Sequence, residues 1–333
     1  MQTRQLGRTG PVVSAIGLGC MGMSDLYGPT DRQESLATLQ AALDAGVTLL
    51  DTGDFYGMGA NELLLAEALH GRPRDSWVVS VKYGALRGPD GAWLGVDTRP
   101  TATKAFAAYS LRRLGTDHID IYRPARLDPA VPIEDTVGAI ADLVRAGHVR
   151  HIGLSEVGPE TIRRAHAVHP IADLQIEYSL VSRGIEEGIL DTCRELGIGI
   201  TAYGVLSRGL ISGHWQHDPL RANDFRSHSP RFTGANLDHN LQLVETLREL
   251  ARSHDATPAQ LAIAWVLAQG RDIVPLVGAR RRDRLAESLG ALAIELDGAD
   301  LAAIDAAFPP DAAAGARYAA SQMAILDSER AAA

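Results

Sequence analysis

Cysteine is scarce in this sequence, and its scarcity excludes several kinds of site. The two cysteines, Cys20 and Cys193, lie far apart in the chain, so they predict neither a disulfide framework nor a metal site. No uninterrupted apolar run approaches the ~18 residues of a membrane helix, and the start of the chain lacks the apolar stretch of a signal peptide. We therefore expect a cytoplasmic protein with reduced thiols, no bound metal and no membrane segment.

Positive charge is also limited. The chain has 32 basic and 41 acidic residues, a net charge of −9, and its basic residues are scattered except at 280–282. A nucleic-acid partner would require a basic patch, so we expect a small molecule instead; monomer and homo-oligomer both remain open. Only two basic residues are lysines, Lys82 and Lys104. Because the pKa of a lysine moves readily with its surroundings, Lys82, which ends an apolar run, is a candidate for proton chemistry.

The pattern of the chain predicts a barrel. Short β-like runs alternate with helical stretches such as 32–44, 101–114 and 133–146. The expected strands are 15–19, 48–51, 77–82, 118–122, 151–155, 172–177, 199–203 and 272–277. Strands separated by helices of this length form parallel βαβ units, and eight such units favour a closed (β/α)8 barrel, the TIM barrel. We expect one such domain over residues 1–333.

Several segments lie outside the regular repeat. Residues 3–13, with Gly10-Pro11 at the turn, are expected to form an N-terminal β-hairpin over the bottom of the barrel. Two long loops, 84–100 and 206–240, follow predicted strands, so they lie on the C-terminal face, where barrel enzymes build their active sites. They are either substrate loops or tolerated insertions. The tail 310–333 is either flexible or folded over the same face.

Residues 17–22 match the dinucleotide-binding pattern G-x-G-x-x-G. In a true Rossmann unit the glycines open the helix, and an acidic residue ends the second strand about 20 residues further on. Here the helix is expected to begin near Asp31, and Asp51, which ends the second strand, has another use below. We interpret the match as coincidental. The chain also has no Tyr-x-x-x-Lys pair of the kind found in short-chain dehydrogenases.

Six ordered segments resemble the aldo-keto reductase superfamily: GVTLLDTGDFYGMGANE, SVKYG, GLSEVG, DLQIEYSL, AYGVLSRGL and IVPLVGARRRDRLAES. The resemblance covers nearly the whole chain, and the fold of that family is the eight-stranded barrel already expected from the periodicity. It implies NADPH as cofactor and the reversible reduction of an aldehyde or ketone as the reaction.

The resemblance also implies three catalytic residues, Asp51, Tyr56 and Lys82. Negative charge grows on the carbonyl oxygen as hydride arrives at its carbon, so a positioned acid must supply a proton. Tyr56 is expected to be that acid, with the Lys82 ammonium stabilising the phenolate and Asp51 keeping the lysine charged. Taken singly, the three could instead be a helix cap, an amphipathic loop residue and a solvated strand end.

Cofactor residues follow from the same resemblance. They are Met21 in the first loop, Ser155 and Gln175 beside Asp51 for the carboxamide, Tyr203 for stacking on the nicotinamide, Leu206, Ser207 and Arg208 for the pyrophosphate, and Gly278, Arg280, Arg284, Glu287 and Ser288 around the 2′-phosphate and adenine. The arginines favour NADPH, because guanidinium groups bind a phosphate dianion bidentately. A solvated helix start is the alternative explanation for residues 280–282.

One stretch departs from the family. Residues 122–128 read Tyr-Arg-Pro-Ala-Arg-Leu-Asp, and Ala125 stands where a histidine is usual. Losing such a donor commonly costs about 10²-fold or more in rate. The stretches Pro-Ala-Arg-x-Asp-Pro, Val-Pro-Ile-Glu-Asp and Gly-Leu-Ser-Glu-Val resemble the pyridoxal-reductase-like branch, which also lacks this histidine. This resemblance implies pyridoxal or a similar aromatic aldehyde as the substrate, assisted by its own phenolic oxygen or by a water. Arg126 either contacts that substrate or points away into a salt bridge.

Two other functions remain open at this stage. One is an NADPH-binding regulatory or sensor protein with slow turnover, like the channel β-subunits that share this fold. The other is an NADP-dependent sugar or alcohol dehydrogenase that works mainly in the oxidative direction.

Overall fold

The computed structural model describes residues 1–24, 27–215, 220 and 224–329. Within these residues, eight parallel strands form a closed barrel in the order β10, β11, β12, β3, β4, β5, β8, β9. They are β3 (Gly17–Gly19), β4 (Leu49–Gly53), β5 (Val78–Tyr83), β8 (Ile119–Pro124), β9 (Val149–Ser155), β10 (Ile171–Glu177), β11 (Gly199–Tyr203) and β12 (Ile273–Gly278). Each corresponds to an expected strand, which confirms the predicted TIM barrel.

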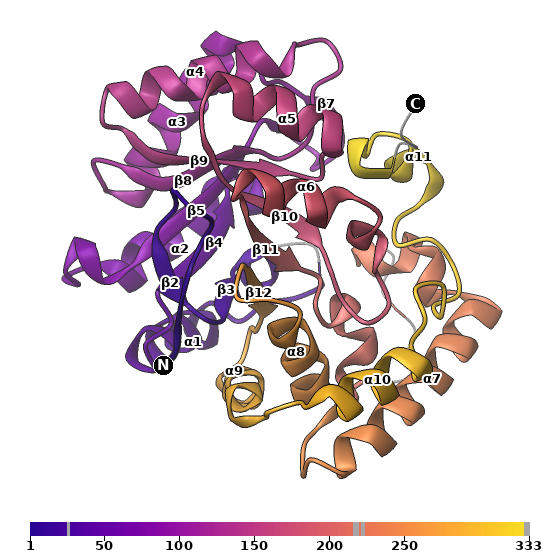
Figure 1. Ribbon diagram of the computed structural model, residues 1–333. Helices are drawn as coiled ribbons and strands as arrows, with labels where there is room; N and C mark the ends of the chain where they lie inside the picture. Colours follow the sequence, from indigo (N-terminus) through magenta and orange to yellow (C-terminus); the bar gives the residue numbers. More distant parts are fainter. Residues whose placement is uncertain (25–26, 216–219, 221–223, 330–333) are drawn as a thin grey trace.

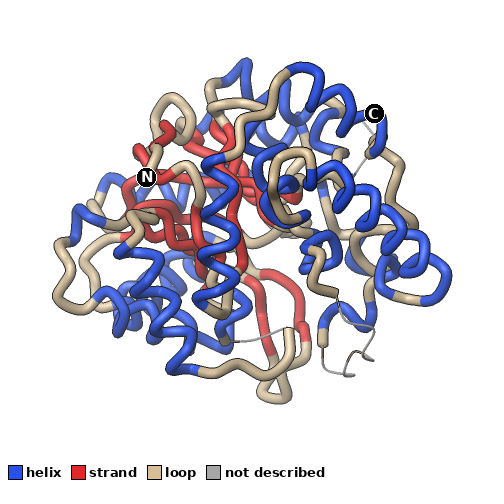
Figure 2. Tube along the Cα trace, turned by 90° about the horizontal axis from the view of Figure 1, so that it is seen from below, coloured by secondary structure: helices blue, strands red, loops and turns tan. Residues whose placement is uncertain are grey.

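Helices surround the barrel (Figure 1), and Figure 2 shows the strands gathered in the middle with helices around them. The described helices are α1 (Arg32–Asp44), α2 (Ala60–Leu69), α3 (Pro100–Leu114), α4 (Ile133–Arg145), α5 (Pro159–Val168), α6 (Ile189–Leu196), α7 (Gly234–Arg252), α8 (Pro258–Ala268), α9 (Arg282–Gly290), α10 (Gly298–Ala307) and α11 (Ala320–Met323). Helix α1 begins after Asp31, whose carboxylate accepts a hydrogen bond from the Glu34 N–H. The start predicted near Asp31 is therefore confirmed.

The N-terminal hairpin closes the bottom of the barrel, as predicted. Strands β1 (Thr3–Gln5) and β2 (Val12–Ser14) pair antiparallel. Between them, Gly7 has a φ of +66°, and a Cβ there would lie 2.2 Å from the carbonyl oxygen of Ala172 near the start of β10. Only glycine allows this approach. The hairpin leaves the opposite, C-terminal face for the site.

The two long loops on the C-terminal face are partly ordered by local pairing and short helices. The first contains a second hairpin, β6 (Ala85–Arg87) with β7 (Trp93–Val96). The second contains η5 (Ser207–Ser212), η6 (Phe225–His228) and η7 (Pro230–Phe232), while its residues 216–219 and 221–223 lie outside the described chain.

The expected end of the second loop, at residue 240, was wrong, because helix α7 already begins at Gly234. The polar sequence of its first turns resembles a loop. The structure explains one of these polar residues: buried Asn240 donates to the backbone oxygens of Arg231 and Ala314 and accepts from the Ala314 N–H. The amide of Asn240 thus joins the start of α7 to the C-terminal tail.

The described part of the tail folds over the C-terminal face and appears in yellow in Figure 1. The Ser328 N–H donates to the backbone oxygen of Glu156, just beyond β9, and the Gly158 N–H donates to Asp327 at 2.9 Å. Residues 330–333, which were included in the predicted tail, lie outside the described chain.

Candidate active site

The central charge pair of the site joins two neighbouring strands. Asp51 lies in β4 and Lys82 in β5, and the strand register pairs Asp51 with Ser80. The Lys82 ammonium forms an ion pair with the Asp51 carboxylate, which also accepts hydrogen bonds from Ser80 Oγ at 2.8 Å and Gln175 Nε2 at 2.7 Å. Burial lowers the pKa of Lys82, whereas the Asp51 charge acts to raise it. The carboxylate therefore favours the charged form of the lysine.

Tyr56 lies just beyond β4, in the short segment η2 (Tyr56–Gly59), where the next two residues both have φ of 53°. This sharp turn leaves Tyr56 only 6% exposed, and the Lys82 nitrogen lies 5.1 Å from the centre of its ring. Burial and the Asp51 charge raise the pKa of Tyr56 well above its usual value, while the Arg126 charge lowers it. Burial and the Asp51 charge together outweigh the Arg126 charge, so the hydroxyl keeps its proton at neutral pH.

Two further charged residues extend this arrangement across the barrel. Arg123 in β8 donates to Ser80 Oγ and to Asp173 Oδ2 in β10, both at 2.9 Å, and both charged side chains are fully buried. The name inner network is used below for Asp51, Ser80, Lys82, Arg123 and Asp173. Sequence analysis assigned no role to Arg123 or Asp173. The sequence could have pointed to both, because each is a charged residue inside an apolar strand, and burying a charge is costly unless the charge is paired.

Ser155, Gln175 and Tyr203 lie at the C-terminal ends of adjacent strands. The pairing of β9 with β10 aligns Ser155 with Gln175, and the pairing of β10 with β11 aligns Glu177 with Tyr203. Ser155 Oγ is buried and has no hydrogen-bond partner in the described structure. An unpaired buried hydroxyl costs about 1–3 kcal/mol, so Ser155 is suited to bind a polar group of a ligand.

Leu206, Ser207 and Arg208 follow β11. Ser207 and Arg208 have positive φ values of 46° and 56°, a strained conformation that is concentrated at functional sites. Ser207 Oγ and Arg208 Nη1 are buried, and neither finds a hydrogen-bond partner among the residues described. Arg208 uses Nη2 to donate to Glu177 at 2.9 Å. The turn therefore presents one hydroxyl and one guanidinium nitrogen that a ligand could satisfy.

The residues expected at the adenosine end of a cofactor come together where β12 leads into α9: Gly278, Arg280, Arg284, Glu287 and Ser288. Arg280 donates to the carbonyl oxygen of Tyr27 at 2.9 Å. Arg284 and Glu287 both contact His214, from the loop after β11, and His214 Nε2 lies 2.8 Å from the Glu287 carboxylate. The side chains of Arg280, Arg284 and Glu287 are held by contacts with loops that a ligand would have to replace.

Met21 lies in η1 (Met21–Met23), directly after β3, the strand that pairs with β12. The expected cofactor residues therefore follow neighbouring strands of the barrel from β9 through β10, β11 and β12 to β3. The structure brings them together along one arc of the rim, beside the inner network.

A second buried charge network lies on the rim and includes the tail. Arg317 donates to both carboxylate oxygens of Glu156, at 3.0 and 2.5 Å, and to Glu177 at 3.3 Å. Tyr203 Oη donates to Glu156 at 2.6 Å and lies 2.7 Å from Tyr318 Oη. The name rim network is used below for Glu156, Glu177, Arg208 and Arg317. None of its acidic residues, nor Arg317 or Tyr318, was assigned from the sequence.

The charge of Glu156 is strongly favoured. Burial by itself raises the pKa of this carboxylic acid, but the adjacent Arg317 guanidinium and the hydrogen bond from Tyr203 bring it down to about 2. Glu156 follows β9 directly, has a positive φ of 54° and is fully buried. The tail is thus attached to the rim by an ionised carboxylate.

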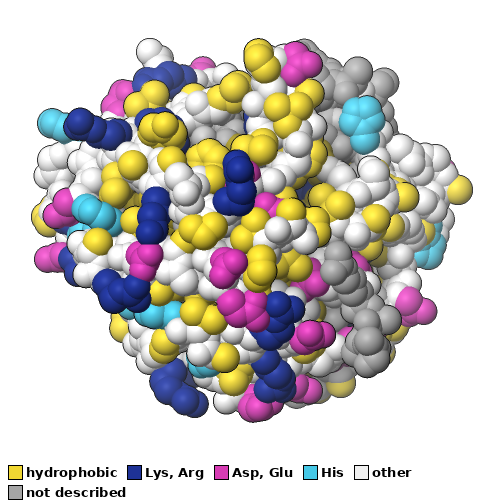
Figure 3. Space-filling view, turned by 90° about the horizontal axis from the view of Figure 1, so that it is seen from above, with side chains coloured by type: hydrophobic (Ala, Val, Ile, Leu, Met, Phe, Trp, Pro, Cys, Tyr) yellow, Lys and Arg dark blue, Asp and Glu magenta, His cyan; other side chains and the backbone are white. Residues whose placement is uncertain are grey.

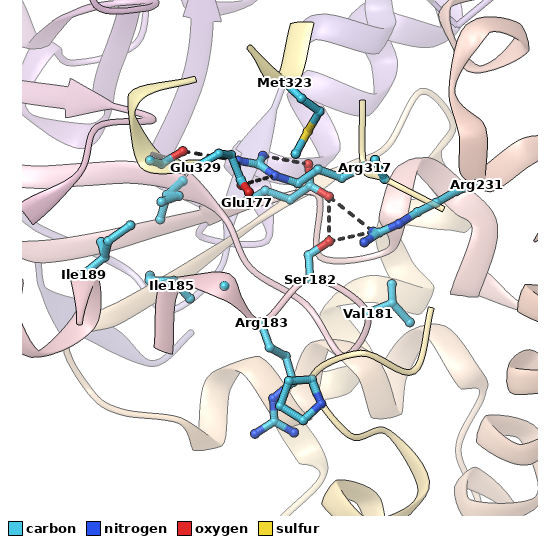
Figure 4. A pocket seen from close by; sticks show the side chains of 15 residues that line it. Glu177, Val181, Ser182, Arg183, Ile185, Ile189, Arg231, Arg317, Met323 and Glu329 are labelled. Carbon is cyan, nitrogen blue, oxygen red and sulfur yellow. Dashed lines mark hydrogen bonds and ion pairs between the residues drawn. The ribbon is translucent and has the colours of Figure 1, made fainter. Parts of the chain in front are cut away.

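A hollow lies beside the rim network (Figure 4). Glu177 and Arg317 line one side, and Arg231 reaches Ser182 Oγ at 2.7 Å on another. Met323 of the tail also lines it. The lining includes neither Tyr56 nor Lys82, so this hollow is separate from the proton-carrying part of the site.

Ala125 and Arg126 follow β8. The Ala125 N–H donates to the Tyr83 carbonyl at 2.8 Å, and its methyl side chain is buried. Arg126 Nη1 donates to the Ala125 carbonyl at 2.6 Å. In the described part of the chain, no carboxylate forms a salt bridge with Arg126, and its charge acts on Tyr56.

Other site types find no support in the described residues. They contain no group of three His, Cys, Asp or Glu side chains that could hold a metal ion. None of the described helices combines the length and the apolar character needed to cross a membrane. On the face shown in Figure 3, positive and negative side chains are interspersed among hydrophobic ones.

The chain is similar to known proteins over nearly its whole length. Residues 15–308 match the model of the aldo/keto reductase family. A probable aldo-keto reductase 1 from Glycine max is 44% identical over 321 residues, which cover 96% of this chain and 92% of that protein.

Solved structures show the same relation. A glycerol dehydrogenase from Gluconobacter oxydans is 28% identical, with a TM-score of 0.84 over 92% of this chain and 96% of that one. The holo form of an aldo-keto reductase from Bacillus halodurans is also 28% identical, with a TM-score of 0.77 over 93% of this chain and 97% of that one. By sequence and by fold, this chain belongs to the aldo/keto reductase family, whose members are oxidoreductases that generally use a nicotinamide cofactor.

Proposed function

We propose that the protein is an NADPH-dependent reductase of aldehydes or ketones, with Tyr56 as the proton donor. The observation that carries this proposal is the buried meeting of Tyr56, Lys82 and Asp51 at the ends of β4 and β5. When bound, the nicotinamide would supply a hydride to the carbonyl carbon. The Tyr56 hydroxyl gives its proton to the carbonyl oxygen, and the Lys82 ammonium, held by Asp51, stabilises the phenolate left behind.

The residues on the rim fit a nicotinamide dinucleotide. Three buried polar atoms lack partners within the described chain, namely Ser155 Oγ, Ser207 Oγ and Arg208 Nη1. We assign the first to the carboxamide and the other two to the pyrophosphate. Because a buried unpaired group is costly, these atoms support the presence of a polar ligand along this arc.

The preference for NADPH rests on Arg280 and Arg284. Their guanidinium groups lie at the start of α9 and could bind a 2′-phosphate in place of the Tyr27 carbonyl and His214. Replacing both with glutamine should raise the KM for NADPH far more than the KM for NADH. Arg282→Gln is the matched control, because Arg282 pairs with Glu34 on the surface. Equal changes for the two cofactors would contradict the assignment.

For the substrate, we propose pyridoxal or a similar aromatic aldehyde. Ala125 carries only a methyl group where the family usually has a histidine, and the segment around it resembles the pyridoxal-reductase-like branch. Oxidation of an alcohol is a second candidate function, supported by the likeness to the Gluconobacter glycerol dehydrogenase.

The test is the loss of NADPH absorbance with pyridoxal, with other aldehydes and ketones, and with glycerol plus NADP⁺ in the reverse direction. Tyr56→Phe should lower kcat/KM by about 10²–10⁴-fold while NADPH still binds, as measured by calorimetry. Tyr109→Phe is the control, because Tyr109 is 58% exposed on α3. Unchanged turnover in Tyr56→Phe would rule out this mechanism.

A further inference from the structure

Glu177, the last residue of β10, is contacted by arginines from three separate segments of the chain. Its Oε2 atom accepts hydrogen bonds from Arg208 Nη2, in the loop after β11, at 2.9 Å and from Arg317 Nη1, in the tail, at 3.3 Å. Its Oε1 atom lies 3.8 Å from Arg231 Nη1, in η7 (Figure 4). The Glu177 side chain is fully buried, so water screens these charges only weakly. Arg208 and Arg317 therefore share one buried carboxylate oxygen.

The barrel holds this carboxylate against the turn that carries Arg208. The register of β10 and β11 pairs Glu177 with Tyr203, and Gly204 follows with a φ of +67°. A Cβ on Gly204 would lie only 3.0 Å from Cγ of Glu177, so glycine is what allows this close approach. Glu177 is thus fixed by a strand, whereas Arg208 and Arg317 reach it from a loop and from the tail.

The docked tail does not use the donors that we assign to the pyrophosphate. Arg317 of the tail binds Glu177, and the ring centre of the next residue, Tyr318, lies 4.5 Å from Cζ of Arg208. Arg208 Nη1 nevertheless has no hydrogen-bond partner among the residues described, and neither has Ser207 Oγ. Arg208 therefore contacts the shared carboxylate with one nitrogen and keeps the other for a ligand.

We propose that Glu177 couples the cofactor site to the tail, so that a phosphate group bound at Arg208 strengthens the docking of the tail through Arg317. This inference rests on the proposed function, because the phosphate is that of a nicotinamide dinucleotide. A phosphate beside Arg208 adds negative charge, which offsets part of the positive charge that stabilises Glu177. Arg317 then neutralises more of the charge on Glu177, so undocking the tail costs more in the bound state than in the free state.

Arg317 is the cation whose contact with Glu177 depends on the tail. Arg231 donates its Nη1 to Ser182 Oγ at 2.7 Å and its Nε to the Gly315 carbonyl at 3.1 Å, so its hydrogen bonds go to neutral acceptors. Arg317, in contrast, bonds directly to the oxygen that Arg208 also uses. Because coupling between two sites is reciprocal, the docked tail should in turn strengthen the binding of NADPH.

Hydrogen exchange of the wild type tests the coupling. The amides of residues 316–329 should exchange at least ~5-fold more slowly with saturating NADPH than without it. Inorganic pyrophosphate, which carries only the phosphate part, should give some of this protection. Helix α4, which contributes none of these residues, is the internal control. Unchanged or faster exchange of the tail with both ligands would overturn the inference.

A double-mutant cycle separates the shared contact from a direct effect of Arg317 on the phosphate. Arg317→Gln should weaken NADPH binding, measured by calorimetry, by at least ~5-fold. In a Glu177→Gln background the same substitution should have little effect, because the shared oxygen has lost its charge. Arg164→Gln, which changes an exposed arginine paired with Glu134, is the control. A loss of equal size in both backgrounds would overturn the role of Glu177.

The outcomes also distinguish this inference from the proposed function. If aldehydes are reduced with full dependence on Tyr56, but neither ligand protects the tail, the inference fails and the reductase function stands. If no aldehyde is reduced, but NADPH or pyrophosphate protects the tail in the wild type and not in Glu177→Gln, the coupling stands and the reductase function fails. If Glu177→Gln does not fold, the exchange of the wild type with and without ligand decides by itself.

Discussion

The inner network and the rim network are both buried charge clusters of one barrel, but they are positioned differently. The charged members of the inner network sit on the strands themselves, and the sheet register brings Asp51 beside Ser80. In the rim network, Arg317 comes from the tail and reaches Glu156 across 161 positions of sequence. The barrel therefore preorganises the inner network, whereas the Arg317 contacts of the rim network exist only while the tail is docked.

This difference predicts different roles. Groups that handle a proton must hold their geometry without further reorganisation, which suits the inner network. A cluster assembled from a tail and two loops can open for a ligand at the cost of a few side-chain contacts. Tyr203, a proposed cofactor residue, donates a hydrogen bond to Glu156. Opening and closing of the tail is therefore expected to affect cofactor binding at the rim rather than the proton donor Tyr56.

The largest contrast is expected in turnover. Lys82→Met should lower kcat/KM for an aldehyde by about 10²–10⁴-fold, because the phenolate of Tyr56 loses its cation. Arg317→Met, the matched change in the rim network, should stay within about tenfold of the wild type. Steady-state kinetics of both variants decide the point. Loss of turnover in both would mean that the tail is part of the catalytic machinery.

The next contrast is in stability. Arg123→Met leaves Asp173 buried without its partner and should lower the free energy of unfolding by about 3–5 kcal/mol. Arg163→Gln, which breaks the exposed pair with Glu195, should cost less than about 1 kcal/mol. Urea denaturation measures both. Similar losses of unfolding free energy in the two variants would show that the buried pair of Arg123 and Asp173 contributes no more to stability than an exposed pair.

A smaller effect is expected in local opening. Arg317→Gln should increase amide hydrogen exchange in the tail, residues 316–329, while strands β4 and β5 keep the protection of the wild type. Exchange followed by mass spectrometry checks this segment by segment. Equal exchange in wild type and variant would mean that contacts such as those of Asn240 hold the tail by themselves.

The smallest effect concerns pH. The pKa of Glu156 in the fold is about 2, below the ordinary value of 4.5. Its ionised form therefore contributes stability that is complete above about pH 4.5 and is lost progressively as the pH falls toward 2. Tail protection measured by hydrogen exchange should decrease over this window in the wild type. Glu156→Gln should flatten that dependence, and an equally steep decrease in the variant would assign it to another group.

Much of this molecule could be predicted from the sequence, although unevenly. The strands were predicted well because parallel strands are buried on both faces and appear as apolar runs. The start of α7 was missed because the polar residues of its first turns show no helical period of apolar residues. One of these polar residues, Asn240, forms hydrogen bonds with the tail. Arg123 and Asp173 were visible as charges in apolar strands, but their pairing required the barrel to close.

By itself, the sequence determined the barrel and the meeting of Asp51, Tyr56 and Lys82. Local periodicity specifies each βα unit, and parallel strands end at the same edge, so residues at their ends must converge. Only the tertiary structure decided that Arg317 docks on Glu156 and Glu177. These contacts join loops and a tail that have no periodic pattern, so they arise only when the folded barrel brings distant segments together.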